Sequence, residues 1–145
     1  MAAVGLVAAA GLTFAATPAQ AVTVDKQTLV GPYTNITCVG LEPADIDISE
    51  TLAGFALFKA DTTKNTLSVA VNIRGAEPNT EYPVRFLQSN GDDCFIIDGT
   101  LTTRANGNGS LRLSEPITGT AAQVIIDTSE LFGLPSYRAS QAFVF

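Results

Sequence analysis

Alternation of apolar and polar residues is the clearest pattern in this chain. From Leu67 to Arg74, branched residues at every second position alternate with small or polar ones, as in a strand with one buried face. Similar or weaker patterns predict further strands at Thr23–Val30, Phe55–Ala60, Tyr82–Phe86, Phe95–Thr103, Leu111–Leu113, Ala122–Ile126 and Ala142–Phe145. Turn-forming residues separate them at Asp61–Asn65, Gly75–Asn79, Asn90–Asp93 and Asn106–Gly109. About eight or nine short strands predict an all-β fold, either an antiparallel Greek-key sandwich, which we favour, or a closed barrel.

The residue pattern does not define the structure of two segments. Asp98-Gly99 is a strong signal for a two-residue hairpin turn, although one long strand from Phe95 to Thr103 with a bulge at Gly99 is the slightly favoured alternative. The segment Glu130–Ser140 has no strand pattern. We expect it to be a loop packed across one end of the fold.

The first 21 residues have the composition of a secretion signal. An apolar run from Ala2 to Ala16 is followed by Ala19-Gln20-Ala21, a small-x-small ending that signal peptidase cleaves after. No Lys or Arg precedes the run, although signal peptides usually open with positive charge. Because the apolar run and the cleavage motif outweigh this missing charge, we expect a leader at 1–21 and one secreted domain at 22–145, with no membrane span in the mature form. A buried N-terminal helix is the alternative.

Charge and composition narrow the possible functions. The chain has no His, and 14 acidic residues against 8 basic ones give a net charge of -6. Without His, triads that need an imidazole base and the usual His-ligated metal sites are excluded. Because nucleic acids and anionic membranes are bound by concentrated positive charge, the net charge argues against both partners.

Cys38 and Cys94 are the only cysteines, and 55 residues separate them. An even pair in a secreted chain most often forms a disulfide. Closing a loop of this length would stabilise the fold by about 4 kcal/mol in the chain-entropy model. A catalytic Cys would need a base beside it, and a thiolate metal site would need more ligands. We expect a structural disulfide, no metal and no cofactor.

Carboxylates cluster in two predicted loops, one with Glu42, Asp45, Asp47 and Glu50 and the other with Asp92 and Asp93. Neither cluster has the spaced D-x-D-x-D-G pattern of a calcium loop, so solvated acidic loops are the favoured interpretation. Together these loops are the predicted binding surface. A carboxylate-dependent hydrolase built on such a pair is a minor alternative.

The run Pro78-Asn79-Thr80-Glu81-Tyr82-Pro83-Val84 resembles the loop and strand of immunoglobulin-like domains of the fibronectin type III kind. This resemblance implies an immunoglobulin-like sandwich in which Tyr82 forms a tyrosine corner, with its hydroxyl bonded back to nearby backbone. The wider run from Thr66 to Leu113 is also similar to chordin-type extracellular domains, although it lacks their His motifs. A fainter similarity is to the secreted apoproteins of enediyne antibiotics, which carry small molecules.

These features favour a secreted, non-enzymatic domain that acts by surface contact with an extracellular protein or cell-envelope partner. A small-molecule carrier is the main alternative. In that case Phe132, Leu134 and Tyr137 would line a cleft between the sheets, although a lid over the core is the more ordinary role for these residues.

Overall fold

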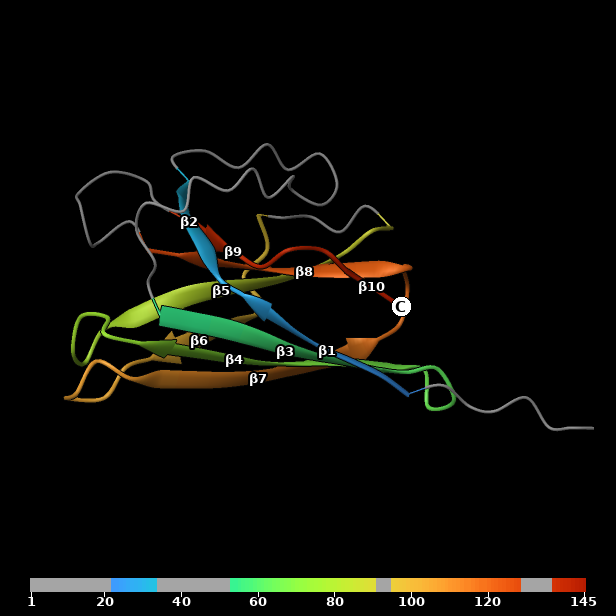
Figure 1. Ribbon diagram of the computed structural model, residues 1–145, viewed down its shortest axis with the longest axis horizontal. Coiled ribbons are helices and arrows are strands. Elements are labelled where there is room, and N and C mark those ends of the chain that lie inside the picture. Colours follow the sequence, from blue (N-terminus) through green and yellow to red (C-terminus); the bar gives the residue numbers. More distant parts are fainter. Residues whose placement is uncertain (1–21, 34–52, 91–94, 129–136) are drawn as a thin grey trace, which may run out of the picture.

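The computed structural model describes residues 22–33, 53–90, 95–128 and 137–145. Within these ranges the chain forms ten strands, all paired antiparallel, and no helix. The strands form two sheets that face each other as two layers (Figure 1). The predicted all-β sandwich is thus confirmed, with ten described strands in place of the expected eight or nine.

The first layer is a four-stranded sheet with the order β1-β3-β4-β7. Its strands are β1 (Val22–Thr28), β3 (Ala53–Asp61), β4 (Thr66–Arg74) and β7 (Gly109–Pro116). The second is a six-stranded sheet with the order β2-β9-β8-β5-β6, in which β10 also pairs with β8. Its strands are β2 (Val30–Tyr33), β5 (Glu81–Gln88), β6 (Gly99–Thr102), β8 (Ala121–Asp127), β9 (Tyr137–Ala139) and β10 (Phe143–Val144).

The chain passes between the layers several times. It crosses from β4 to β5, returns from β6 to β7 and crosses again from β7 to β8, so that β4 pairs with β7 in one layer and β5 with β8 in the other. At the N-terminal side the chain changes layers at Leu29, between β1 and β2. Leu29 is fully buried, and its backbone N–H donates to the Gly54 carbonyl at 3.0 Å.

The core lies between the inner faces of the two sheets. The alternation in β4 buries Leu67, Val69, Val71 and Ile73, as the sequence predicts. Phe58 of β3 stacks on Phe143 of β10 with ring centroids 5.2 Å apart, and it also lies 6.2 Å from the Phe86 ring. Burying a side chain of this size contributes about 1.5 to 3 kcal/mol, so these aromatic contacts between layers are a main source of stability.

Gln88 links the two layers with polar contacts at the end of β5. Its side chain is 3% exposed. The amide nitrogen donates to Glu115 Oε1 and to the Pro116 carbonyl, both at 2.8 Å. The amide oxygen accepts from the backbone N–H groups of Thr118 at 2.8 Å and Gly119 at 3.0 Å. One buried side chain therefore fastens the connection from β7 to β8 to the end of β5 through four hydrogen bonds.

The expected strand from Phe95 to Thr103 is shorter than predicted. Pairing begins only at Gly99, because Asp98 takes over the hydrogen bonds of the preceding position. Its backbone N–H donates to the Val84 carbonyl at 2.9 Å, and its Oδ2 accepts from the Phe86 N–H at 2.7 Å. The three apolar residues before it, Phe95, Ile96 and Ile97, are exposed. Both alternatives for this segment, the bulged strand and the Asp98-Gly99 hairpin, are wrong.

The expected loop at Glu130–Ser140 contains a strand. Tyr137–Ala139 forms β9, which pairs with β8 on one side and β2 on the other. Within β9 the buried Arg138 donates from Nη1 to the Gly31 carbonyl at 2.7 Å. A strand of only three residues, one of them a buried Arg, shows no alternation from which it could be predicted. Phe132 and Leu134 lie outside the described residues.

Candidate functional site

The broadest exposed surface among the described residues is the outer face of the four-stranded sheet. The register aligns its residues in rows that run across the four strands. By strand alternation this outer face consists of Val22, Val24, Lys26 and Thr28 of β1; Ala53, Phe55, Leu57, Lys59 and Asp61 of β3; Thr66, Ser68, Ala70, Asn72 and Arg74 of β4; and Ser110, Arg112, Ser114 and Pro116 of β7. Its members are six short polar residues, four cations, one carboxylate and seven apolar residues, of which Leu57 and Ala70 lie in the middle of the sheet.

Positive charge is concentrated on this outer face. Lys26, Lys59, Arg74 and Arg112 all lie on it, which is half of the chain's 8 basic residues. The one described carboxylate on the outer face is Asp61, at the end where β3 turns into β4. Asp61 lies 3.8 Å from Lys64 Nζ and accepts from the Lys64 N–H at 3.1 Å. A protein of net charge -6 therefore presents a locally cationic surface.

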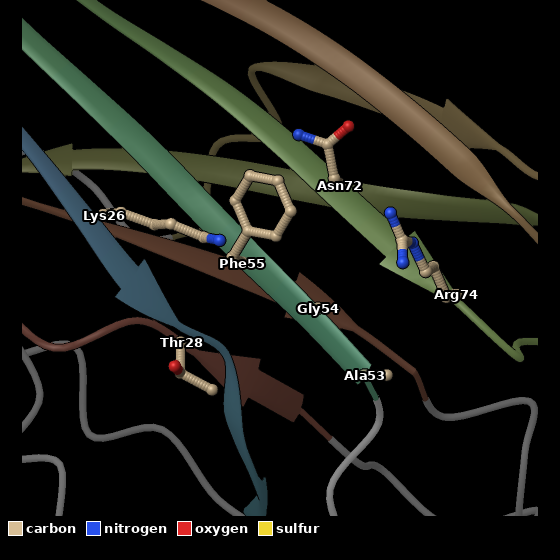
Figure 2. A pocket seen from close by; sticks show the side chains of 7 residues that line it. All are labelled: Lys26, Thr28, Ala53, Gly54, Phe55, Asn72 and Arg74. Atoms are coloured by element: carbon tan, nitrogen blue, oxygen red, sulfur yellow. The ribbon is translucent and has the colours of Figure 1, made fainter.

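A shallow depression of about 390 Å³ lies at one end of this face. Figure 2 shows the half-buried Phe55 ring at its centre, with Lys26 from β1 on one side and Asn72 and Arg74 from β4 on the other. Lys26 Nζ lies 4.1 Å from the centroid of the Phe55 ring. A cation at this distance from an aromatic face is attracted by about 0.5 to 1 kcal/mol at an exposed site, so this contact holds the ammonium group over the ring.

Two further depressions continue this surface. One of about 230 Å³ shares Phe55, Asn72 and Arg74 with the first and extends to Arg104 and Ser110. The other, of about 470 Å³, covers the middle of the sheet around Leu57 and Ala70 and includes Lys59 and Arg112. All three are open and contiguous along the sheet. The outer face is suited to an extended ligand that lies on it rather than to a small molecule that is enclosed.

The outer face of the six-stranded sheet has the opposite character. Leu87 of β5 and both Gln123 and Ile125 of β8 point to this side by alternation, yet they are at most 3% exposed. Arg85 lies among them and is 9% exposed. Its Nε and Nη1 have no hydrogen-bond partner within the described part of the chain, and its guanidinium carbon lies 5.7 Å from the Tyr137 ring centroid. This outer face is closed to solvent at these positions.

Most of the residues singled out from the sequence lie outside the described ranges. These are the two cysteines, Cys38 and Cys94, and the acidic residues Glu42, Asp45, Asp47, Glu50, Asp92 and Asp93. The leader at 1–21 also lies outside them. The disulfide and the acidic binding loops therefore stay predictions.

Tyr82 lies within the described part and is the second residue of β5. Its side chain is 1% exposed, and its hydroxyl oxygen accepts a hydrogen bond from the backbone N–H of Glu77 at 3.1 Å. The phenol is thus tied to the loop that enters its strand. Thr103 supports the same loop, because its hydroxyl donates to the Glu77 carbonyl and accepts from the Thr80 N–H. These bonds give Tyr82 a structural role and place it away from the cationic outer face.

Sequence reasoning did not identify the cationic outer face. Each of Lys26, Lys59, Arg74 and Arg112 occupies a polar position of an expected strand, so the alternation could have placed each on a solvent side. What it could not supply is the order β1-β3-β4-β7, which brings four separate strands into one sheet. The negative net charge argued against any positively charged surface, because a net charge summed over the chain does not show where basic and acidic residues cluster.

The described residues include no group of three or more His, Cys, Asp or Glu side chains placed to hold a metal ion. Among the same residues no helix is both long and apolar enough to cross a membrane. Comparison of the chain with protein-family models, with curated proteins and with solved structures gave no match.

Proposed function

We propose that this chain is a secreted, non-enzymatic β-sandwich domain that acts by surface contact, and that the outer face of the four-stranded sheet makes the contact. The observation that carries the proposal is the concentration of Lys26, Lys59, Arg74 and Arg112 on one broad exposed surface of an acidic protein. Net negative charge keeps a protein soluble. A cationic surface on such a protein is a specific feature that a purely structural domain does not need.

This placement differs from the acidic loops that the sequence favoured. The charged residues of those loops are all carboxylates, whereas the outer face of the four-stranded sheet combines cations, hydroxyl groups and apolar side chains within one surface. Recognition surfaces commonly combine apolar contact with polar groups that fix orientation. The sheet also holds these groups on a rigid element, which reduces the entropy lost on binding.

The inner packing favours a contact domain over a small-molecule carrier. Between the layers, Phe58 contacts Phe86 and Phe143, and Phe143 contacts Phe145 at 5.3 Å. Three depressions, of about 390, 230 and 470 Å³, lie on the outer face of one sheet. A further one, of about 190 Å³, lies where the ends of β5 and β7 meet, beside Gln88 and Glu115. A carrier would instead enclose most of its ligand in an apolar cavity.

The proposal includes secretion of the domain and its relationship to immunoglobulin-like domains. The leader ends at Ala21 in our interpretation, so cleavage there would leave every described residue, from Val22 onward, in the mature domain. An immunoglobulin-like relationship is supported by the pairings β4–β7 and β5–β8, which correspond to the B–E and C–F pairings of that fold. In this alignment Tyr82 lies near the start of the strand equivalent to C, whereas the tyrosine corner of that fold lies near the start of strand F.

Sedimentation with envelope fragments of the producing cells tests the proposal. We expect the purified secreted protein to sediment with the fragments and Ala70→Glu, which places a carboxylate at the centre of the outer face, to lose at least tenfold in affinity. Thr100→Glu is the matched control, because it adds the same charge at an exposed position of β6 in the other sheet. Equal binding by both variants would refute the placement, and no sedimentation of the wild-type protein would refute contact with the envelope.

A further inference from the structure

We propose that the outer face of the four-stranded sheet binds a carboxylate-bearing polysaccharide, whose acidic groups pair with Lys26, Lys59, Arg74 and Arg112. This inference rests on the proposed contact function and names the chemistry of the partner. Charge complementarity is its basis, because four cations share a surface on which Asp61, at one end, is the one described carboxylate.

The register gives the spacing of these cations. Lys26 and Arg112 lie in one row on the two outermost strands of the sheet, about 14 Å apart at the usual strand spacing. A row here is a set of outer-face residues that the register aligns across the strands. Lys59 lies one row away from the row of Lys26 and Arg112, and Arg74 lies two rows away in the opposite direction. Lys59 and Arg74 are therefore separated by about 20 Å along the strands. Cations spread over this distance cannot converge on one small anion. They match a chain in which negative charges repeat.

Short polar side chains fill the space between the cations. Ser68, Asn72, Ser110 and Ser114 occupy the outer positions of β4 and β7. Hydroxyl and amide groups both donate and accept hydrogen bonds, as do the hydroxyl groups of a sugar. The outer face therefore offers charge pairing for carboxylates and, between them, hydrogen bonding for neutral sugar hydroxyls.

The same surface is poorly suited to other polyanions. Single-stranded nucleic acid binds by stacking its bases on aromatic side chains, but the outer face has one aromatic residue, Phe55, and Lys26 Nζ already lies over that ring. A membrane surface would need large exposed apolar side chains. The exposed large aliphatic groups of this face are Leu57 on β3 and Val22 and Val24 on the edge strand β1, and they lie within the strands, not at a protruding loop tip.

The acidity of the rest of the protein does not prevent this binding. Exposed charges are screened beyond about 8 Å at physiological ionic strength, whereas the outer face spans about 20 Å. A chain lying within this face therefore experiences mainly the local cations. Binding should weaken as salt increases, because neutralising a polyanion releases its counterions.

The test compares two variants with the same net charge. Arg112→Gln removes a cation from the outer face, and Lys64→Gln removes one from the exposed turn after β3. With polygalacturonate as the probe at low salt, we expect Arg112→Gln to weaken binding about tenfold and to make the salt dependence less steep. Lys64→Gln leaves Asp61, at one end of the outer face, without this ion pair, and because exposed ion pairs are weak it should lower affinity by less than about twofold. Neutral dextran should not bind, and unchanged melting temperatures should show that both variants are folded.

Three outcomes would overturn the proposal. Equal loss in both variants would show attraction to overall charge rather than to the outer face. Tighter binding of single-stranded DNA or polyaspartate than of polygalacturonate would assign the surface to another class of partner. Absence of polygalacturonate binding while the protein still sediments with envelope fragments, in a manner sensitive to Ala70→Glu, would refute the polysaccharide but leave the contact function standing.

Discussion

The outer faces of the two sheets show how one antiparallel design serves two different surroundings. Leu57 and Ile125 each lie on the outer face of an inner strand of their sheet. Leu57 of the four-stranded sheet is 39% exposed, whereas Ile125 of the six-stranded sheet is fully buried. The sequences differ accordingly, because β4 alternates strictly while β8 is a nearly continuous apolar run, Ala121-Ala122-Gln123-Val124-Ile125-Ile126. Continuous runs are typical of strands buried on both faces. The outer face of the four-stranded sheet is thus exposed, whereas the outer face of the six-stranded sheet is buried at these positions.

The largest expected difference comes from truncating an apolar side chain on each outer face. Ile125→Ala should lower the free energy of unfolding by about 3 kcal/mol, since it leaves a cavity in a closed environment. Leu57→Ala should cost less than about 1 kcal/mol, because water can occupy the space that the side chain leaves. Urea unfolding of both variants measures the difference. Equal costs would contradict the distinction between the outer faces.

The link between the sheets can be tested at Gln88. Gln88→Ala leaves the Thr118 and Gly119 N–H groups and the Pro116 carbonyl without their partner, so we expect a loss of about 2 kcal/mol. Gln27→Ala on the edge strand β1 is the control and should change stability by less than about 0.5 kcal/mol. Thermal unfolding followed by circular dichroism provides the comparison. A loss of stability in Gln88→Ala no larger than in Gln27→Ala would show that the polar contacts of Gln88 do not stabilise the fold.

The smallest expected effect concerns a cation on each outer face. Arg85 is buried, with two nitrogens lacking hydrogen-bond partners among the described residues, so Arg85→Met should raise the free energy of unfolding by about 1 kcal/mol. Arg112→Met on the exposed outer face should change it by less than about 0.5 kcal/mol. Urea midpoints at constant ionic strength measure both. Destabilisation by Arg85→Met would show that this guanidinium is paired in solution.

The sequence was sufficient for the fold class but not for the candidate site. Alternation in Leu67–Arg74 located β4 and its buried side chains, because periodicity is a local property. The short strand β9 was missed since three residues around a buried Arg138 have no periodicity. The cationic outer face depends on which strands are neighbours, and strands as distant as β1 and β7 share one sheet. The contrast between Leu57 and Ile125 likewise depends on what packs against each sheet.

The pairing of β2 with β9 has a consequence for how the molecule folds. Val30 pairs with Ala139, and Arg138 donates to the Gly31 carbonyl across 107 residues of chain. The β3–β4 hairpin can form early because its strands are adjacent in sequence, but the six-stranded sheet cannot close until the C-terminal residues are present. Proteins dominated by such distant pairings fold in milliseconds to seconds. A chain that lacks its last nine residues, which include β9 and β10, should therefore remain incompletely folded.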